Sequence, residues 1–357
     1  MAPSLQSVDA PDRLRLERVD PFAGGDWDEA VQRHPGHSVF HRSAWARVLV
    51  EAYGHRPHCL RFVDEQGAAA LIPLLEVRSL LTGTRVVSLP FSDFAGPLLR
   101  DGADEGQVFE MLAEIAASGD WKHLELRAGP STAFSLPVHR RYLGHQLDLG
   151  PGIDEVEAGF DSATRRAIRK AEKEGVEVSV QSDPAAMEAY YGLHRRTRRR
   201  HGLPPQPARF FRAIQHHLID AGLGKVVLAR ADRDTIAGAV FLHSGDRAVY
   251  KFGASDTAHW QLRPNQAVMA TAIRHLVATG HRRLHFGRTS PSDQGLDRFK
   301  RSWGARAHEL SYHRFHSGSR TWLGPRAESL ESHPALFGHL PLSLNQLAGS
   351  LIYPHLD

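Results

Sequence analysis

The strand–helix–strand pattern between Ala248 and Phe286 constrains the fold of this chain more than any other segment. A predicted strand at 248–253 leads through a polar loop to a helix that begins at Pro264, where the missing N–H of proline costs nothing. Apolar residues then recur at helical spacing, at Met269, Ala272, Ile273 and Leu276. Gly280 ends the helix, and a second strand follows at 283–286. Short units of this kind build an α/β sheet.

A similar pattern occurs in the first half of the chain. The predicted hairpin at 60–74, LRFVDEQGAAALIPL, corresponds to the one at 227–242, VLARADRDTIAGAVFL. The helix–glycine–strand segment at 114–126 corresponds to the one at 275–286. We therefore predict a degenerate tandem repeat, in which residues 50–127 and 220–290 each form a strand hairpin, a helix and a strand.

Four short motifs follow one another within residues 250–304: Y-K-F-G-A-S, then P-N at the helix start, then F-G-R, and finally G-L-D-R-F-K-R-S-W-G. In this order they resemble the FemAB-like branch of the GNAT acyltransferase superfamily, which includes BioF2-like acetyltransferase domains. Its better-known members are peptidoglycan interpeptide-bridge enzymes, which transfer an amino acid from aminoacyl-tRNA to an amine. The segment L-P-F-S-D-F-A-G-P at 89–97 is also similar to the family.

The resemblance implies an α/β fold of two tandem GNAT-like lobes, with mixed, mostly antiparallel sheets flanked by helices. It divides the chain into an N-terminal lobe at 1–150, a C-terminal catalytic lobe at 151–316 and a tail at 317–357 that packs back on the first lobe. The R/Q-x-x-G-x-G/A loop of acetyl-CoA-dependent GNAT enzymes is missing before the helix, where the sequence is WQLRPN at 260–265. Its absence favours the FemAB-like branch over a CoA donor.

The function that the resemblance implies is transfer of an aminoacyl or acyl group to an amine of a peptidoglycan or exopolysaccharide precursor. Aminoacyl-tRNA is the preferred donor, the acceptor is a small-molecule or lipid-linked amine, and no cofactor is tightly bound. Two alternatives stay open. One is a GNAT-type N-acyltransferase that uses acyl-CoA or acyl carrier protein. The other is a non-catalytic nucleic-acid-binding protein, which explains the arginine clusters but not the context of Phe299 and Lys300.

The composition is that of a globular protein. The 357 residues are 41% hydrophobic and 24% charged, with a net charge of +4, and no apolar run is long enough to predict a membrane span. The N-terminal segment lacks the apolar core of a signal peptide, so cytoplasmic residence is expected. The single cysteine, Cys59, excludes an internal disulfide and is expected to be a core thiol. The 23 histidines lack the spacing of zinc sites, so no metal is expected.

Lys300 and Phe299, the F-K pair of the last motif, are the first candidates for catalysis. Acyl transfer to an amine passes through a tetrahedral oxyanion, which a fixed cation stabilises. In the family, this pair lies against the tRNA acceptor end and the reacting ester, and the resemblance carries that role to these two residues. The simpler alternative is an exposed Lys300 in a basic turn, with Phe299 and Trp303 in the core.

The substrate-binding candidates form two sets. The first lies around the predicted helix start, whose free N–H groups attract phosphate or carbonyl oxygens, and comprises Tyr250, Lys251, Asn265 and Arg288. The alternative for this set is that Asn265 only caps the helix and Tyr250 only packs. The second belongs to two basic clusters, at 165–170 and 195–200, which are suited to the phosphates of a nucleic acid or nucleotide. Its members are Arg165, Arg169 and Arg199, and the alternative for each is a solvated helix face.

No general base is identified by the sequence alone. Asp93, Glu125 and His285 lie at or near predicted strand ends, where an attacking amine could lose its proton. Of these, Asp93 is the predicted catalytic candidate, and the alternative is a purely structural role. The family carries an acidic residue soon after Gly-Pro, but here Gly96 and Pro97 are followed by Leu98.

Overall fold

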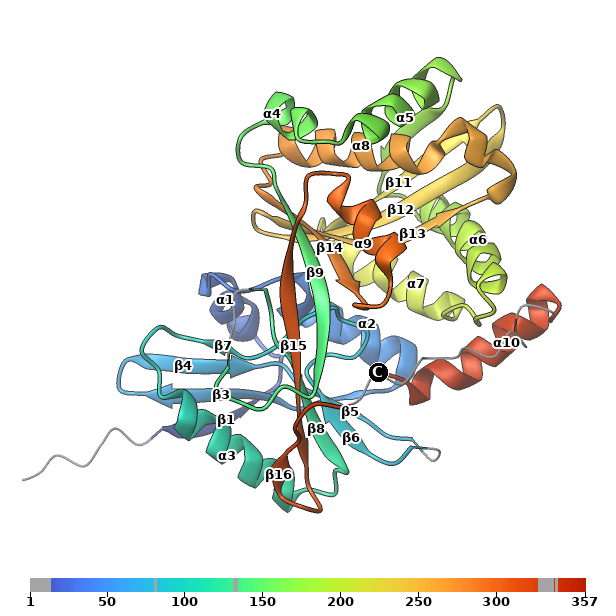
Figure 1. Cartoon of the computed structure of the whole chain (residues 1–357). Helices are drawn as coiled ribbons and strands as arrows, with labels where there is room; N and C mark the ends of the chain where they lie inside the picture. Colours follow the sequence, from blue (N-terminus) through green and yellow to red (C-terminus); the bar gives the residue numbers. More distant parts are fainter. Residues whose placement is uncertain (1–13, 80–81, 131–133, 327–336, 338–339) are drawn as a thin grey trace, which may run out of the picture.

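The computed structural model describes residues 14–79, 82–130, 134–326, 337 and 340–357 (Figure 1). Segment 1–13, part of the N-terminus expected to lack a signal peptide, lies outside the described residues. No helix within the described ranges is long and apolar enough to cross a membrane.

The first part of the chain contains β1 Arg15–Val19, α1 Asp26–Arg33, η1 Val39–His41, α2 Ser43–Tyr53, β2 Arg56–Pro57, β3 Cys59–Asp64, β4 Gly67–Ile72, β5 Leu75–Val77, β6 Arg85–Val87, β7 Leu98–Leu99, α3 Glu105–Ser118, β8 His123–Arg127 and β9 Arg140–Asp148. The second part contains α4 Ile153–Ala158, α5 Ser162–Lys173, β10 Glu177–Gln181, α6 Pro184–Arg200, α7 Ala208–Ile214, η2 Gln215–Ile219, β11 Gly224–Ala231, β12 Asp234–Ser244, β13 Arg247–Ser255, η3 Thr257–Leu262, α8 Pro264–Ala278, β14 Arg283–Thr289 and α9 Gln294–Arg301. The last elements are β15 Arg306–His316, β16 Thr321–Trp322, α10 Leu342–Ile352 and η5 Tyr353–His355.

A long mixed sheet joins the two parts of the chain (Figure 1). Among the described residues it has twelve strands, in the order β10-β11-β12-β13-β14-β9-β15-β8-β6-β5-β2, with β16 paired to β15. A separate four-stranded sheet has the order β1-β3-β4-β7. Only β13–β14 and β6–β8 are parallel among these described pairs, and a helix connects the strands of each, α8 and α3 respectively. The predicted α/β fold with mixed, mostly antiparallel sheets is confirmed.

The order of elements repeats along the chain, as predicted. A hairpin, a helix and a strand occur as β3–β4, α3 and β8 in the first part, and as β11–β12, α8 and β14 in the second. The two copies differ in their sheets. The hairpin β3–β4 belongs to the four-stranded sheet, whereas β11–β12 lies in the long sheet with β14. The repeat is therefore one of element order more than of strand pairing.

The part of the long sheet that belongs to the second lobe is covered on both faces. Strand β12 is buried over consecutive residues without alternation, which is the pattern of a strand with a helix on each side. On one face, Ile273 of α8 packs with Phe241 in the core that also includes residues of α5. On the other face, Tyr190 of α6 packs with Val240, together with residues of α7. Helices α5 and α8 thus lie opposite α6 and α7 across the sheet (Figure 1).

The two lobes share strands and part of a core. Strand β9 pairs with β14 of the second lobe, and β15 returns between β9 and β8 of the first. Helix α2, from the first lobe, packs on α7, with the rings of Trp45 and Phe210 6.1 Å apart. The first proposed boundary, at residue 150, lies just after β9, and the second, at residue 316, coincides with the end of β15. Both boundaries therefore adjoin the strands that tie the lobes together.

The C-terminal segment contacts both lobes. The guanidinium of Arg85 donates to the carbonyl oxygen of His355 at 2.9 Å and to the carboxylate of Asp357 at 3.1 Å. The phenol of Tyr353 accepts from Arg198 at the end of α6, at 2.9 Å. Helix α10 itself lies beside α6, at the edge of the molecule (Figure 1).

Candidate active site where two strands diverge

Strands β13 and β14 separate after a short parallel pairing. Residues Arg247–Val249 pair with Arg283–His285, and beyond this point the strands have different neighbours. Strand β13 continues against β12, while β14 continues against β9. Where parallel strands diverge, backbone groups lose their ladder partners and must be satisfied by other groups.

The divergence of β13 and β14 leaves an opening between them, and each of the two strands has a β-bulge beside it. On β13 the register shifts around Lys251, which has no opposite residue in β12. On β14 the shift lies between His285 and Arg288, so that Phe286 and Gly287 have no opposite residue in β9. Bulges change the direction of side chains and are common next to active sites. The two bulges that border the opening thus lie in the motifs Y-K-F-G-A-S and F-G-R of the sequence.

Asp93 of the first lobe fills this opening. One carboxylate oxygen, Oδ2, accepts from the ammonium of Lys251 at 3.0 Å, and the other, Oδ1, accepts from the backbone N–H of Arg288 at 3.1 Å. Burial works to raise the pKa of Asp93, but the charge of Lys251 and the N–H and charge of Arg288 outweigh it and hold the pKa at about 2. Asp93 is therefore ionised near neutral pH, and both of its oxygens are engaged.

Lys251 is buried among aromatic rings as well as paired. Its ammonium also donates to the carbonyl oxygen of Phe91 at 2.7 Å and lies 5.0 Å from the ring centre of Phe40. Burial lowers the pKa of Lys251, and the neighbouring Asp93 opposes this shift. The ion pair between Asp93 and Lys251 consequently joins the two lobes at the opening.

Lys300 approaches the same opening from α9. Its ammonium donates to the carbonyl oxygens of Gly287 at 2.9 Å and Arg288 at 3.1 Å, so two of its three N–H groups are used. Burial lowers the pKa of Lys300 to about 8, against the opposing charges of Asp93 and Asp293. The group is a desolvated cation that still carries most of its charge near pH 7.

The simpler alternative predicted that Lys300 is exposed, and this prediction is wrong. The side chain is among the buried ones, with 2% of the residue's surface exposed. The reason lies in the tertiary structure, since α9 packs its Lys300 side toward the bulge of β14, where carbonyl oxygens accept from the ammonium. Trp303 is buried as expected, and its ring meets that of Phe160 edge-on at 5.0 Å.

Residues 159–301, which include α5 to α9, match the family model described as "Acetyltransferase (GNAT) domain". This segment of the second lobe is similar to GNAT domains. The match confirms the predicted recognition of the GNAT superfamily and the prediction that the chain is an acyltransferase. No curated protein sequence matches the chain significantly.

Solved structures resemble the whole two-lobe arrangement. FemX superposes with a TM-score of 0.65 and 14% identity, over 83% of this chain and 96% of that chain. The C-terminal domain of a protein described as a lysylphosphatidylglycerol synthetase, from Agrobacterium fabrum, has a TM-score of 0.54 and 14% identity, over 80% and 89%. A tandem GNAT protein from the clavulanic acid biosynthesis pathway has a TM-score of 0.50 and 12% identity, over 86% and 99%. The tandem GNAT-like architecture and its FemAB-like form are thereby confirmed at the level of the fold.

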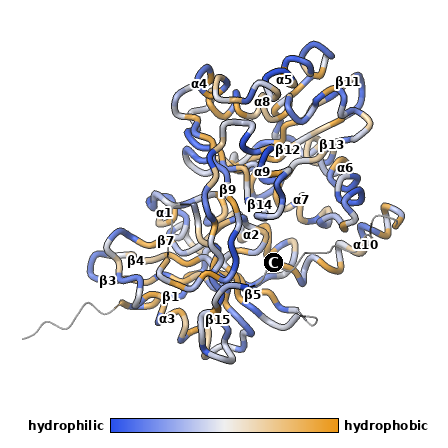
Figure 2. Tube along the Cα trace, viewed as in Figure 1, coloured by the Kyte–Doolittle hydropathy of each residue, from blue (hydrophilic) through white to orange (hydrophobic). Residues whose placement is uncertain are grey.

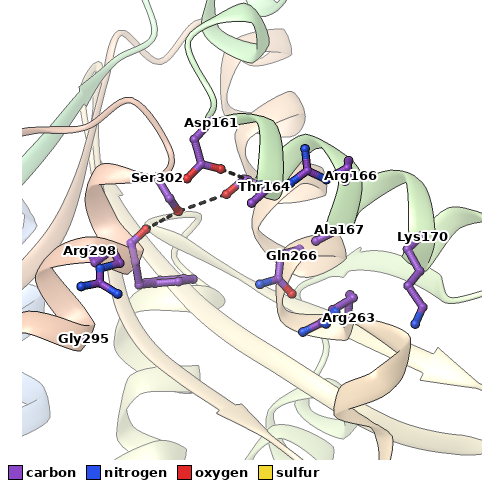
Figure 3. Close-up of a pocket in the computed structure, with 12 residues that line it drawn as sticks. Asp161, Thr164, Arg166, Ala167, Lys170, Arg263, Gln266, Gly295, Arg298 and Ser302 are labelled. Carbon is purple, nitrogen blue, oxygen red and sulfur yellow. Dashed lines mark hydrogen bonds between the residues drawn. The ribbon is translucent and has the colours of Figure 1, made fainter.

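A basic pocket of about 550 Å³ adjoins the GNAT-domain helix α9 on its other side (Figure 3). Arg298 lies on one side of it, and Arg166, Lys170 and Arg263 come from α5 and from the residue before α8. Phe299 also lines the pocket. Four cations line this pocket, and the start of α8 adds the positive end of the helix dipole, so the pocket suits a phosphate-bearing ligand.

The pocket wall is held by contacts between the start of α5 and the end of α9. The Thr164 hydroxyl donates to Ser302 Oγ at 3.1 Å, and Ser302 Oγ donates to the carbonyl oxygen of Phe299 at 2.7 Å (Figure 3). Phe299 and Lys300 are consecutive on α9. The pocket and the opening between β13 and β14 are therefore adjacent, with the F-K pair between them.

Tyr250 and Asn265 lie in the GNAT domain but outside the Asp93–Lys300 group. The ring of Tyr250 packs on Phe241, and burial raises the pKa of its phenol to about 12. Its hydroxyl oxygen lies over Gly253, where an added Cβ would be 1.8 Å away. Asn265, at the start of α8, donates to Ser255 Oγ at 3.2 Å. Both residues thus shape the end of β13 in the structure.

The predicted arginine candidates are not gathered in one place. Arg165 donates to the carbonyl oxygens of Ala158 and Phe160, at 2.8 and 2.7 Å, so it caps α4. Arg169 is exposed on α5, and Arg199 is exposed near the end of α6. Because α5 and α6 cover opposite faces of the sheet, the two basic clusters do not form a single surface. The cluster residues that line the pocket are Arg166 and Lys170.

The other two candidates for a general base are occupied by structural contacts. Glu125 is buried between Arg127 and Arg314; burial works to raise its pKa, but these two arginines hold the pKa at about 2. Burial and the neighbouring His308 keep the pKa of His285 well below its usual value, and its Nδ1 accepts from the N–H of Gly287. Cys59 is a buried core thiol, as expected, and burial raises its pKa to about 12.

Sequence reasoning missed the aromatic residues that hold Arg288. The guanidinium of Arg288 lies 4.7 Å from the ring centre of Tyr142 and donates to the hydroxyl of Tyr312 at 3.1 Å. That hydroxyl in turn donates to the carbonyl oxygen of Asp93 at 2.8 Å. Tyr142 and Tyr312 belong to β9 and β15, and no local motif marks them. Only the pairing of β9 with β14 and of β15 with β9 brings these two tyrosines to the site.

Proposed function

We propose that this protein transfers an aminoacyl group from aminoacyl-tRNA to an amine of a cell-envelope precursor, in the cytoplasm. The observation that carries the proposal is the buried Lys300 ammonium, held by two carbonyl oxygens between a basic pocket and the Asp93–Lys251 pair. The family match supports acyl transfer in general. The fold likeness to FemX and to the lysylphosphatidylglycerol synthetase domain supports the aminoacyl group by analogy.

In the proposed reaction the acceptor amine attacks the ester carbonyl of the donor directly. A C–N bond forms, the C–O bond of the ester breaks, the amine loses a proton and the leaving hydroxyl gains one. The third N–H of Lys300, which is not used by Gly287 or Arg288, donates to the carbonyl oxygen as negative charge develops there. Since the two bonds to the backbone hold the ammonium in place, little reorganisation is needed during the step.

Asp93 has a positioning role in this proposal. With a pKa of about 2 and both oxygens engaged, it is a poor acceptor for the proton of an amine. Its Oδ1 instead accepts from the backbone N–H of Arg288, and the carbonyl oxygen of the same residue accepts from the Lys300 ammonium. We therefore keep Asp93 in the site as the residue that orders the cation, together with Lys251 and Arg288.

The donor is proposed to enter through the basic pocket. Phosphates of a tRNA acceptor end would lie among Arg166, Lys170, Arg263 and Arg298, with Phe299 available for contact with a base or ribose. The acceptor is proposed to be a small-molecule or lipid-linked amine from the peptidoglycan or exopolysaccharide pathway. That amine would approach the opening from the first lobe, which supplies Asp93.

One observation favours an acyl-CoA donor as a second candidate. The same four cations stand next to the start of α8, a position equally suited to a pyrophosphate. The residue before the helix is Arg263 in a left-handed conformation, with φ of 59°, and it replaces the glycine-rich loop of the acetyl-CoA enzymes. Room for a pyrophosphate thus exists, although the usual loop does not.

Titration calorimetry with charged tRNA and with acetyl-CoA separates the two donors. We expect tRNA binding that weakens steeply as salt rises and weak binding of acetyl-CoA. Arg298→Gln should lower the tRNA affinity and reduce the salt slope by about 1. Arg33→Gln on α1, which removes an equal charge from an exposed site far from the pocket, is the control. Micromolar acetyl-CoA affinity with no salt-dependent tRNA binding would replace the proposal by the CoA alternative.

Mass spectrometry of ligands retained on the purified protein gives an independent answer. An RNA 3′ end among the retained molecules supports the aminoacyl-tRNA donor. A coenzyme A adduct supports the second candidate.

A further inference from the structure

Helix α10 is attached to the molecule through its polar and small residues. Asn345 is fully buried, and its side-chain amide donates to the carbonyl oxygen of Phe337, eight residues earlier in the same C-terminal segment, at 2.7 Å. Gly349 lies so close to Pro205 that an added Cβ would be 2.0 Å from its carbonyl oxygen. Gln346 donates to the hydroxyl of Tyr191 on α6 at 3.4 Å. The inward face of α10 is thus built for close packing without large apolar side chains.

The outward face of the same helix carries leucines. Leu344, Leu347 and Leu351 are 51%, 56% and 64% exposed, and they are spaced three and four residues apart, so they form one stripe. This is the reverse of an ordinary surface helix, which turns its leucines to the core and its polar residues to water. The helix lies at the edge of the molecule, and its trace is coloured largely as hydrophobic (Figures 1 and 2).

Arginines of α6 and α7 lie beside helix α10. Arg209 of α7 donates to the carbonyl oxygen of Ser350 at 3.5 Å, and the exposed Arg212 follows it by one helical turn. On α6, the guanidinium of Arg195 lies 5.5 Å from the ring centre of Tyr191, the residue that Gln346 contacts. Helix α10 itself contains no acidic residue between Leu342 and Ile352. An apolar stripe flanked by cations has the chemistry of a helix that lies in a membrane interface.

We propose that the leucine stripe of α10 docks on the surface of a bilayer that contains anionic phospholipids. The three leucines would enter the boundary between head groups and acyl chains, while Arg195, Arg209 and Arg212 would lie near lipid phosphates. A second copy of this chain fits the stripe less well, because a two-fold contact through α10 would bring both sets of arginines together. The proposal concerns attachment only and does not depend on the reaction proposed above.

Vesicle flotation of the full chain tests this docking. We expect the protein to float with vesicles that contain phosphatidylglycerol and to stay behind with pure phosphatidylcholine vesicles, with binding reduced by salt. The triple change Leu344→Ser, Leu347→Ser and Leu351→Ser should lower the partition coefficient at least about tenfold. The pair Arg209→Gln and Arg212→Gln should lower it several-fold, because each arginine adds to the attraction.

Matched controls keep the result interpretable. The pair Arg33→Gln and Arg320→Gln removes the same charge from exposed sites away from α10 and should leave flotation unchanged. Since the leucines are exposed, the triple variant should have the same melting temperature as the wild type. If its melting temperature falls, the single variant Leu351→Ser replaces it in the flotation test. Absence of flotation with anionic vesicles overturns the proposal. So does a concentration-dependent dimer that the serine changes abolish, which would assign the stripe to self-association.

Discussion

Asp93 and Lys251 form an ion pair of 3.0 Å between residues that are 158 positions apart in the chain. The pair closes the opening between β13 and β14, and its carboxylate also holds the N–H of Arg288. Arg288 then offers its carbonyl oxygen to Lys300. One first-lobe carboxylate thus orders the cation that we place next to the reacting ester.

Replacing Lys300 by Met removes the cation and keeps most of the side-chain volume. In single-turnover measurements with saturating donor, the rate should fall about a hundredfold, or roughly 3 kcal/mol in activation free energy. Lys300→Arg should restore it only in part, because a planar guanidinium does not fit the place of a compact ammonium. Arg301→Met is the control, since Arg301 is exposed and paired with Asp297. A wild-type rate for Lys300→Met would remove the residue from the mechanism.

The stability of the Lys300→Met variant should also change. An exposed lysine would leave the melting temperature almost unaltered, but Lys300 is buried. Its loss leaves the carbonyl oxygens of Gly287 and Arg288 without their donor, so we expect a loss of about 1–3 kcal/mol in unfolding free energy. Urea unfolding of the variant measures this. The rate effect above must therefore be compared at a temperature where both proteins are folded.

The pH dependence of the rate should reveal the charge of Lys300. Burial lowers the pKa of Lys300 to about 8, so the cation is lost as pH rises through this value and the single-turnover rate should fall. Lys300→Arg should lack this alkaline decline, because arginine stays protonated. Persistence of the same decline in Lys300→Arg would assign it to another group.

The same pKa shift has a consequence for stability with a definite sign. The folded value of about 8 is below the ordinary 10.5, so between these values the unfolded chain binds the proton that the folded chain has released. The contribution of Lys300 to unfolding free energy therefore rises with pH across this window and is constant below it. Urea unfolding of wild type and Lys300→Met across this pH range measures the change. If the unfolding free energy of wild type relative to Lys300→Met stays constant or falls between pH 8 and pH 10.5, this assignment is contradicted.

Breaking the pair between Asp93 and Lys251 should destabilise the protein strongly. Asp93→Asn leaves a buried ammonium without its counter-charge, which costs about 3–5 kcal/mol. Adding Lys251→Met should recover much of the loss, and a double-mutant cycle by urea unfolding measures the coupling. Because the pKa of Asp93 is lowered to about 2 from 3.8, this stabilisation should be complete above pH 4 and decline as pH falls toward 2. Additive single-mutant effects would show that the pair is not coupled.

Gly287→Ala should affect both stability and rate. Gly287 has φ of +71°, and an added Cβ would lie 3.2 Å from Asp93 Oδ1, so the bulge that presents two carbonyl oxygens to Lys300 must shift. We expect a loss of about 1–2 kcal/mol from the left-handed backbone alone and a lower single-turnover rate. Gly280→Ala is a matched control, because Gly280 has φ of +81° and nothing within 4 Å of the added Cβ. Equal rates for the two variants would argue against a role of the bulge.

The sequence by itself determined the features that depend on a few neighbouring residues. Helix α8 begins at Pro264 and Gly280 follows its end with positive φ, because these residues act on the local backbone. The repeated order of hairpin, helix and strand was readable for the same reason, as was the burial of Trp303 and Cys59. The four motifs within 250–304 predicted the GNAT superfamily, and the family model that matches residues 159–301 agrees.

Only the tertiary structure decided how the candidate residues are grouped. Lys300 is buried and Arg165 caps α4, although both belong to basic runs that look alike in the sequence. The bulges at Lys251 and Gly287 arise from strand register, which depends on partners far away in the chain. Whether a charge is exposed, paired or desolvated is set by the elements that pack against it. That packing joins Asp93 to Lys251 across the lobes and separates α5 from α6 on opposite faces of one sheet.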